Sequence, residues 1–293
     1  MARLASRQAP VDPEMARASE VLDVLAELWR DLSPALPPGV PAVEAAEVRL
    51  EGGVPALAGE PLIDGPALVA GVREIGRRLR AIEGYATAGE VSDALARHSS
   101  TFDTELFAAT ALGGMWDQMA SLADGLELDA HALITLADYA ARPALRAGAL
   151  VVKPLVTASR WGRGTCPSCG APPALSVRSG KEGDRSLFCP RCGTGWRYPR
   201  VRCPACGEDD HRRLGALHAS GEGDFRRADV CDTCRSYVKS VAALDPPDAD
   251  GVLRLDLDTA ALDFAAIELG YHREGVPDDR GGPRETGPAE HRR

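Results

Sequence analysis

All eight cysteines of the sequence fall into four Cys-x-x-Cys pairs. A tight turn with this spacing aims both sulfurs of a pair at one point, and two such pairs complete a tetrahedral site of four thiolates. Disulfides need an oxidising compartment, and the segment from Met1 to Glu20 contains no apolar stretch that could serve as a signal peptide, so we expect a cytoplasmic, metal-binding protein. A redox-active dithiol in one pair is the alternative. The pairs are Cys166 with Cys169, Cys189 with Cys192, Cys203 with Cys206, and Cys231 with Cys234.

The distances between the pairs along the chain indicate which pairs share an ion. Residues 170–188 separate the first pair from the second, residues 207–230 separate the third from the fourth, and only the short stretch 193–202 separates the second from the third. Ribbons with two Cys-x-x-Cys turns usually have about 15 to 20 residues between them, so the first of these spacings fits the range and the second is slightly longer. The spacing therefore favours two ribbons in tandem, and a cross-braced arrangement that joins the first pair to the third is the alternative.

The cysteine region has few side chains with which to build a core. Large apolar side chains (Val, Ile, Leu, Met, Phe, Trp and Tyr) are much sparser over residues 163–245 than over residues 12–160. A structural metal contributes roughly 10 to 16 kcal/mol of apparent binding free energy, which such a segment needs in order to fold. Four thiolates accept zinc or a single rubredoxin-like iron, so we expect two metal ions, iron or zinc, and the ligands do not decide between them.

The first half of the chain has the periodicity of helices. Apolar residues recur at three-residue and four-residue intervals, and no alternating pattern typical of strands competes with them. The predicted helices span residues 13–32, 66–82, 102–122, 130–141 and 143–159, and a final helix is predicted to begin near Asp258 within residues 251–270. No apolar run is long enough to span a membrane.

These patterns predict an α+β protein: an N-terminal all-α helical domain, two tandem rubredoxin-like or zinc-ribbon metal-binding domains, and a C-terminal helix. The polar, Gly-rich and Pro-rich end of the chain is predicted to be disordered. The expected divisions are residues 1–160 for the helical domain, 161–200 and 201–245 for the two metal domains, 246–272 for the C-terminal helical segment, and 273–293 for the tail.

Charge is distributed unevenly along the chain. Residues 163–213 contain ten Lys or Arg and five Asp or Glu, a formal charge of +5, although the whole chain carries −9. A basic ribbon could bind an acidic protein surface or nucleic acid, or its arginines could neutralise the thiolates. We disfavour nucleic acid because the whole chain is acidic. No nucleophile elbow, phosphate loop or HExxH signature occurs, so the sequence predicts no catalytic site and a protein that is not an enzyme.

Three stretches resemble the formate dehydrogenase accessory, or formation, proteins of the FdhE family. The first is WGRGTCPSCG from Trp161, with Pro173 shortly after it. The second is CPRCGTGWRYPRVRCPAC from Cys189 to Cys206, in which Trp196, Arg200 and the basic residue before Cys203 stand in register. The third is the last pair followed by Tyr237-Val-Lys239. The likeness extends over roughly residues 142–272, and residues 1–140 depart from the pattern.

The resemblance implies an N-terminal helical domain, two rubredoxin-like metal domains, which hold iron in family members, and a maturation role without catalysis. The implied partner is the catalytic subunit of a formate dehydrogenase, bound before export through the twin-arginine pathway. A nucleic-acid-binding ribbon and a rubredoxin-like electron carrier are the alternative functions, and the oligomeric state is open. The residues expected at the partner surface are Trp161, Arg163, Trp196, Arg197, Arg200 and Arg202.

Overall fold

The computed structural model describes residues 12–32, 42–98, 102–180, 183–218 and 225–274. The chain divides into two compact units. The first comprises Met1–Pro37 and Ile63–Pro143, and the second comprises Pro38–Leu62 and Ala144–Arg293. Helix α7 (Ala130–Ala158) contributes to both units. The predicted tail lies outside the described residues, except for Arg273 and Glu274.

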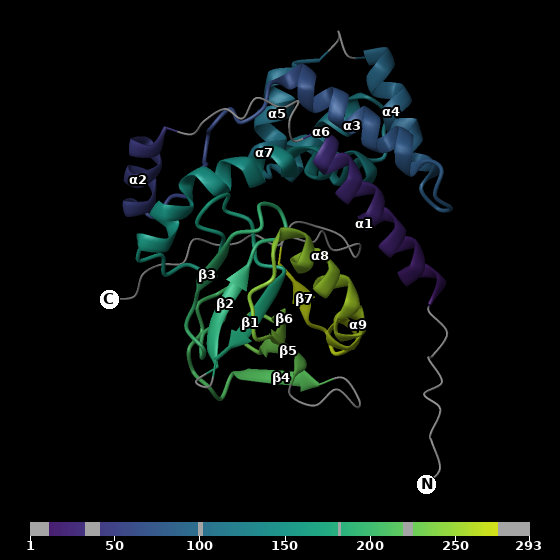
Figure 1. Ribbon diagram of the computed structural model, residues 1–293. Helices are drawn as coiled ribbons and strands as arrows, with labels where there is room; N and C mark the ends of the chain where they lie inside the picture. The colour runs from purple at the N-terminus through teal and green to yellow at the C-terminus, as the bar shows by residue number, and fades with distance from the viewer. Residues whose placement is uncertain (1–11, 33–41, 99–101, 181–182, 219–224, 275–293) are drawn as a thin grey trace. The chain divides into compact units, whose positions relative to one another are not determined.

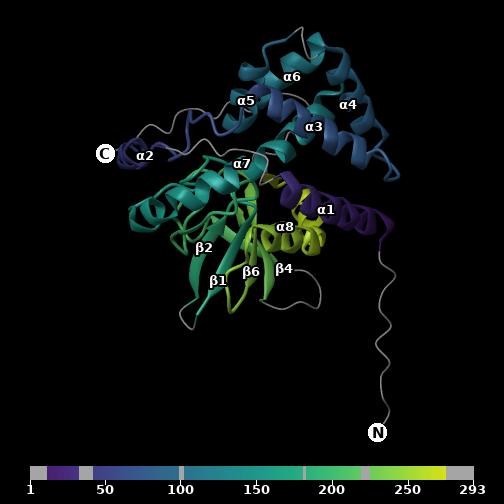
Figure 2. The same ribbon diagram turned by 45° about the horizontal axis from the view of Figure 1, so that its top comes forward.

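The first unit is helical, as the sequence predicts. Its helices are α1 (Pro13–Leu32), α3 (Gly65–Leu79), α4 (Ala86–His98), α5 (Thr104–Gly113), α6 (Trp116–Gly125) and the first half of α7. Figures 1 and 2 show α3 and α4 side by side. Their close approach depends on Gly76, because a Cβ there would clash with the carbonyl oxygen of Ala88. The apolar stripes face inward, and Leu25, Val72 and Leu95 are fully buried.

Three of the predicted helical regions are divided differently in the structure. The helix predicted over residues 102–122 is two helices, because Gly114 adopts the left-handed conformation (φ 66°) that ends α5. The two helices predicted around Pro143 are one, because α7 continues through the proline. The C-terminal region contains α8 (Ala249–Asp258) and α9 (Ala260–Glu268), separated at the buried Thr259, where one helix was predicted.

Helix α7 shows how a helix accommodates an internal proline. Pro143 has no N–H to donate to the carbonyl oxygen of Tyr139, four residues earlier. That oxygen instead accepts a hydrogen bond of 2.9 Å from Nε1 of Trp29 in α1. The buried Arg142 lies over both rings, with its guanidinium carbon 4.7 Å from the Tyr139 centroid and 5.6 Å from that of Trp29.

In its described residues the second unit is built on a sheet of seven strands, accompanied by α2 (Val43–Glu51), the second half of α7, α8 and α9. The strands lie in the order β3-β2-β1-β6-β5-β4, and β7 pairs with β6. Their bounds are β1 (Leu175–Ser179), β2 (Asp184–Phe188), β3 (Gly195–Arg197), β4 (Leu214–His218), β5 (Arg226–Cys231), β6 (Ser236–Ala242) and β7 (His272–Arg273). Arg273, predicted to begin the tail, therefore belongs to the sheet.

The sheet repeats one pattern twice. An antiparallel hairpin, β1-β2 or β4-β5, is followed by a third strand, β3 or β6, and a Cys-x-x-Cys turn stands before each hairpin and again after it. The two halves join through parallel pairing of β1 with β6, in which Leu175 lies opposite Lys239. The two ribbons thus share one continuous sheet.

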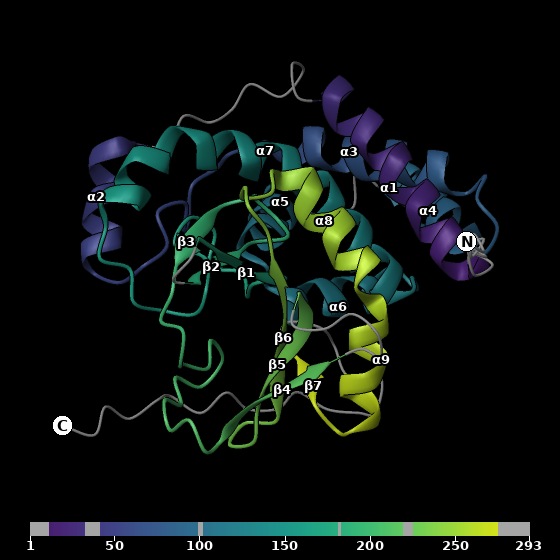
Figure 3. The same ribbon diagram turned by 60° about the horizontal axis from the view of Figure 1, so that its bottom comes forward.

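One face of the sheet packs on the C-terminal helices. Leu175 and Val241 pack with Val252 of α8, and Ala228 and Val230 pack with residues of α9. Figure 3 shows α8 and α9 running along the sheet. Because side chains alternate across a strand, the opposite face carries a different row of residues. It combines the polar Ser176, Arg185, Arg227, Asp229 and Ser240 with the apolar Leu187, Trp196 and Val238. In the described residues no helix has the length and apolar character needed to cross a bilayer.

Candidate metal centres

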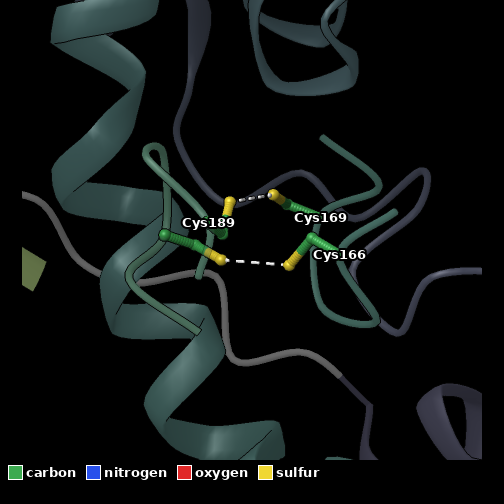
Figure 4. Close-up of side chains that lie close together, drawn as sticks. Cys166, Cys169 and Cys189 are labelled. Carbon is green, nitrogen blue, oxygen red and sulfur yellow. Dashed lines mark hydrogen bonds between the residues drawn. The ribbon is translucent and has the colours of Figure 1, made fainter. Parts of the chain in front are cut away.

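The four Cys-x-x-Cys turns meet in two groups. Cysteines 166, 169, 189 and 192 form the first group and cysteines 203, 206, 231 and 234 the second; within each group all four sulfurs lie within 4.8 Å of one another. The first turn thus meets the second and the third meets the fourth, which is the tandem arrangement and not the cross-braced one. Figure 4 shows the thiols of Cys166, Cys169 and Cys189 converging between two turns.

The sulfur separations fit a tetrahedral ion. The Sγ atoms of Cys166 and Cys192 are 3.5 Å apart, as are those of Cys169 and Cys189, and the matching distances in the second group are 3.7 Å. A metal–sulfur bond of about 2.3 Å gives a tetrahedron with edges of roughly 3.8 Å. A disulfide would need sulfurs about 2.05 Å apart. Each group can hold one metal ion, zinc or iron.

Backbone hydrogen bonds hold each turn in shape. In the first, the N–H of Gly170 donates to the carbonyl oxygen of Cys166 at 2.9 Å, and the second and third turns repeat this bond. The glycine after each of these pairs has a positive φ, between 74° and 83°. The fourth turn has Arg235 at this position, with φ 61°. Its guanidinium carbon lies 3.9 Å from the ring centroid of Tyr271, so contacts with the C-terminal segment hold this strained residue.

Two hydroxyl groups next to the sulfurs were not recognised from the sequence. Thr194 Oγ1 lies 3.2 Å from Cys192 Sγ and 2.8 Å from the Oγ of buried Ser168, in the first turn. Ser236 Oγ lies 2.9 Å from Cys234 Sγ in the second group. Thr194 and Ser236 each stand two residues after the last cysteine of their group. This repeated position was the sequence signal that could have identified them.

The two groups differ in their exposure to solvent. Three cysteines of the first group are buried and Cys169 is half-buried, whereas Cys206 of the second group is exposed. The segment after α2 helps to cover the first group, because the N–H groups of Ala56 and Leu57 donate to the carbonyl oxygens of Pro167 and Ser168 at 2.8 and 2.9 Å. Sequence reasoning assigned residues 56 and 57 to the helical domain and missed this contact.

The thiols of each group also perturb one another. A hydrogen bond from Cys234 lowers the pKa of Cys203 to about 4, and burial raises the pKa of Cys206 to about 11. In the first group, burial raises the pKa of Cys166, while hydrogen bonds from neighbouring thiols lower the pKa of Cys169. One sulfur in each group therefore ionises readily, and an ion that binds four thiolates displaces protons from the others.

The six residues predicted for a partner surface do not all lie at the surface. Trp196 is 6% exposed and its Nε1 donates to the carbonyl oxygen of Arg163 at 3.3 Å, so its ring packs inside the sheet unit. Arg163, Arg197 and Arg200 are exposed. Trp161 and Arg202 are half-buried. The partner surface itself stays a prediction.

The fold and the two groups of cysteines define a protein with two zinc-ribbon-like centres in one sheet. Residues 165–200 match the family model described as "FdhE, central domain", and residues 201–278 match "FdhE, C-terminal domain". Residues 165–278 are therefore similar to the central and C-terminal domains of the FdhE family, and the resemblance seen in the sequence is confirmed.

Individual relatives agree with this assignment. The chain is 35% identical over 112 residues to a protein FdhE homolog of Stutzerimonas stutzeri, and 37% identical over 117 residues to that of Pseudomonas aeruginosa. These alignments cover 37% and 38% of this chain, and 36% and 38% of the relatives, so the chain matches little more than a third of their length. The crystal structure of the P. aeruginosa FdhE protein superimposes with a TM-score of 0.58 at 25% identity, covering 89% of this chain and 94% of that one.

Proposed function

We propose that this protein is an accessory factor for a formate dehydrogenase and that its eight cysteines bind two metal ions, iron or zinc. The observation that carries the proposal is the coincidence of the FdhE domain matches, residues 165–278, with both groups of converging sulfurs. In this proposal the ions hold together a sheet unit whose own apolar core is small. The protein then binds the catalytic subunit of the dehydrogenase in the cytoplasm, before that subunit is exported.

The proposed role is binding and not catalysis. Four sulfurs that all ligate one ion leave it no open position for a substrate, which is the property of structural centres. The exposed Arg163, Arg197 and Arg200 offer cationic groups to an acidic client surface. We propose that these arginines, with Trp161 and Arg202, contribute to the docking surface.

Gene deletion in the native host tests this proposal. Formate oxidation should be lost while the dehydrogenase polypeptide is still made, and the wild-type gene should restore activity. Anaerobic affinity purification should recover the catalytic subunit with the wild-type protein. The proposal is wrong if the deletion strain oxidises formate at the wild-type rate.

Complementation with variants separates metal binding from docking. Cys166→Ser should fail to restore formate oxidation because it removes a ligand that lies among the first four sulfurs. A triple Arg163→Ala, Arg197→Ala, Arg200→Ala variant should keep both metal ions but recover less of the catalytic subunit. Lys153→Ala, which changes one charge outside this surface, serves as the control.

Electron transfer is a second candidate, and one observation favours it. Cys206 is exposed, so an iron ion in the second group would lie close to solvent and to a redox partner. Zinc does not change its oxidation state, so electron transfer requires that the second group binds iron. An absorption spectrum of protein purified without oxygen should show thiolate-to-iron charge transfer if iron is bound. A colourless protein with two zinc ions eliminates this candidate.

A further inference from the structure

The fourth Cys-x-x-Cys turn differs from the other three at the residue that follows it. Each of the first three turns is followed by a glycine with a positive φ, whereas the fourth is followed by Arg235 with φ 61°. The left-handed backbone is unfavourable for a residue that carries a side chain, and it persists where surrounding contacts compensate for it. The contacts of Arg235 therefore indicate what holds this turn in shape.

Arg235 binds residues 269–273, the segment at the end of α9 that continues into β7 and that we call the C-terminal strap. Its Nη2 donates to the carbonyl oxygen of Leu269 at 2.6 Å, at the C-terminal end of α9. Its guanidinium carbon lies 3.9 Å from the centroid of the Tyr271 ring. Its carbonyl oxygen accepts a hydrogen bond of 2.8 Å from the N–H of His272. The strap therefore contacts both the side chain and the backbone of Arg235.

Two further contacts join the strap to the fourth turn. The hydroxyl of Tyr271 donates to Oδ1 of Asp232, which lies within the turn, at 2.6 Å. His272 lies opposite Ser236 in the parallel pairing of β7 with β6. The Oγ of Ser236 is in turn 2.9 Å from the Sγ of Cys234. The strap is thus connected to the turn on both sides of its last cysteine.

The strap is itself anchored to the sheet unit away from the turn. The Nη2 of Arg273 donates to the carbonyl oxygen of Ala174 at 3.1 Å and to Oδ1 of Asp256 at 2.7 Å. The side chain of Tyr271 packs against a buried apolar cluster formed by β5, β6 and α9. Because these anchors do not involve the cysteines, the strap has a position of its own from which it can hold the turn.

We propose that Arg235 and Tyr271 are positioning residues of the second metal centre, and that through them the C-terminal strap holds the fourth turn in its metal-binding conformation. Coupling between two binding events is reciprocal, so an ion in the second centre also holds the strap on the sheet. The inference rests on the metal binding proposed above. It adds that the strength of this binding depends on a segment that supplies no ligand.

Glycine at position 235 distinguishes this role from backbone strain alone. Arg235→Gly introduces the residue type that follows the other three turns, and it removes the steric cost of the positive φ. Relief of strain alone would strengthen zinc binding at the second centre by roughly fivefold. We expect the opposite, binding that is about tenfold weaker, because the contacts with the strap are lost. The direction of the change therefore decides between the two interpretations.

Zinc release from the full chain to a chromogenic chelator measures the effect at each centre. Cys231→Ser lacks a ligand of the second group, so the release phase that it loses belongs to the second centre. Arg235→Gly and Tyr271→Ala should make this phase about tenfold faster and leave the other phase unchanged. The unchanged phase establishes that the sheet unit is folded. Arg212→Ala is the matched control, because this arginine is in the same ribbon but forms its ion pair with Asp210.

Hydrogen exchange tests the reciprocal effect on the strap. Loss of the second ion in Cys231→Ser should speed amide exchange in residues 269–273, since the N–H of His272 is bonded to the carbonyl oxygen of Arg235 beside the fourth turn. Cys166→Ser, which removes a ligand of the first group, is the control. Its strap should exchange as slowly as that of the wild type.

Two outcomes would overturn the proposal. One is release from the second centre that is unchanged or slower in Arg235→Gly or Tyr271→Ala, which would leave residue 235 as a strained position without a role in metal binding. The other is equal exchange of the strap in Cys231→Ser and Cys166→Ser. A wild-type protein that binds no metal would instead contradict the proposed function, so the two failures are distinguishable.

Discussion

Trp29 donates a hydrogen bond from its indole Nε1 to the backbone carbonyl oxygen of Tyr139, at 2.9 Å. The bond satisfies the acceptor that Pro143 leaves without a helical donor. It also ties α1 to α7 within the helical unit, although the two residues lie 110 positions apart in the sequence. A proline that sequence reasoning takes as a helix boundary is thereby accommodated inside a helix.

This bond predicts an energetic coupling between Trp29 and Pro143. Trp29→Phe should lower the free energy of unfolding by about 2 kcal/mol, because it leaves a partly buried carbonyl unpaired and removes ring volume. In a Pro143→Ala background the loss should be smaller, since the alanine would supply an N–H to the Tyr139 carbonyl. Urea unfolding of the four proteins of this cycle measures the coupling. Equal losses in both backgrounds would contradict the account.

The grouping of the cysteines predicts how metal content responds to mutation. Cys166→Ser and Cys231→Ser should each lower the content from two ions to one, because each removes a ligand from one group only. The double variant should hold none. Elemental analysis of the purified proteins measures this. Retention of a full pair of ions in either single variant would show that the sulfurs do not act as two sets of four.

Different exposure predicts that the ions leave in a fixed order. The second group should release its ion to a chelator first, because Cys206 is exposed whereas three cysteines of the first group are buried. Release from the wild type should therefore have two phases. Cys231→Ser, which retains only the first centre, should show the slow phase, and Cys166→Ser the fast one. The reverse assignment would contradict the role given to burial.

The hydroxyl of Thr194 should strengthen the first centre. Thr194→Val keeps the shape of the side chain but removes the contacts with Cys192 Sγ and Ser168 Oγ. Groups of this kind typically contribute about 10-fold to 100-fold to metal affinity. We therefore expect affinity at the first centre to fall at least about tenfold in competition with a chromogenic chelator. Thr233→Val, whose hydroxyl bonds to Glu208 instead of a sulfur, is the matched control and should change little.

A buried charge network predicts the response of stability to acid. Burial by itself would raise the pKa of Asp256. The positive charges of Arg273 and Lys239 have the larger effect and hold that pKa below its ordinary value. The ionised Asp256 therefore contributes fully to stability at pH values above the ordinary aspartate pKa. This contribution is lost as the pH falls through the lowered pKa of Asp256 in the folded protein. Lys239, only 1% exposed, depends on this carboxylate at 2.8 Å.

Asp256→Asn tests this network. At pH 7 the variant should be less stable by roughly 2 kcal/mol, below the usual range for breaking a buried pair because Asp263 still contacts Lys239. The difference from the wild type should shrink as the pH falls below about 4. Urea unfolding at a series of pH values measures it. The exposed Asp258→Asn variant controls for general charge, and a difference that stays constant with pH would contradict the prediction.

The sequence predicted the local features of the metal centres. A Cys-x-x-Cys turn is specified by a few neighbouring residues, and the spacing between Cys169 and Cys189, which is typical of a ribbon, favoured the pairing that the structure shows. The apolar stripe of α1 predicted its bounds from Pro13 to Leu32, because helical periodicity is also a local property. The identities of neighbouring residues were sufficient in both cases.

Tertiary structure decided what depends on partners far away in the chain. The continuation of α7 through Pro143 required a donor from Trp29, and the cover of the first centre came from Ala56 and Leu57. The union of two ribbons in one sheet rests on the pairing of β1 with β6, and Arg185 anchors the segment between the ribbons through the carbonyl oxygens of Pro199 and Arg202. Hydrogen bonds and packing between residues distant in sequence leave no periodic signal along the chain, so only the folded structure reveals them.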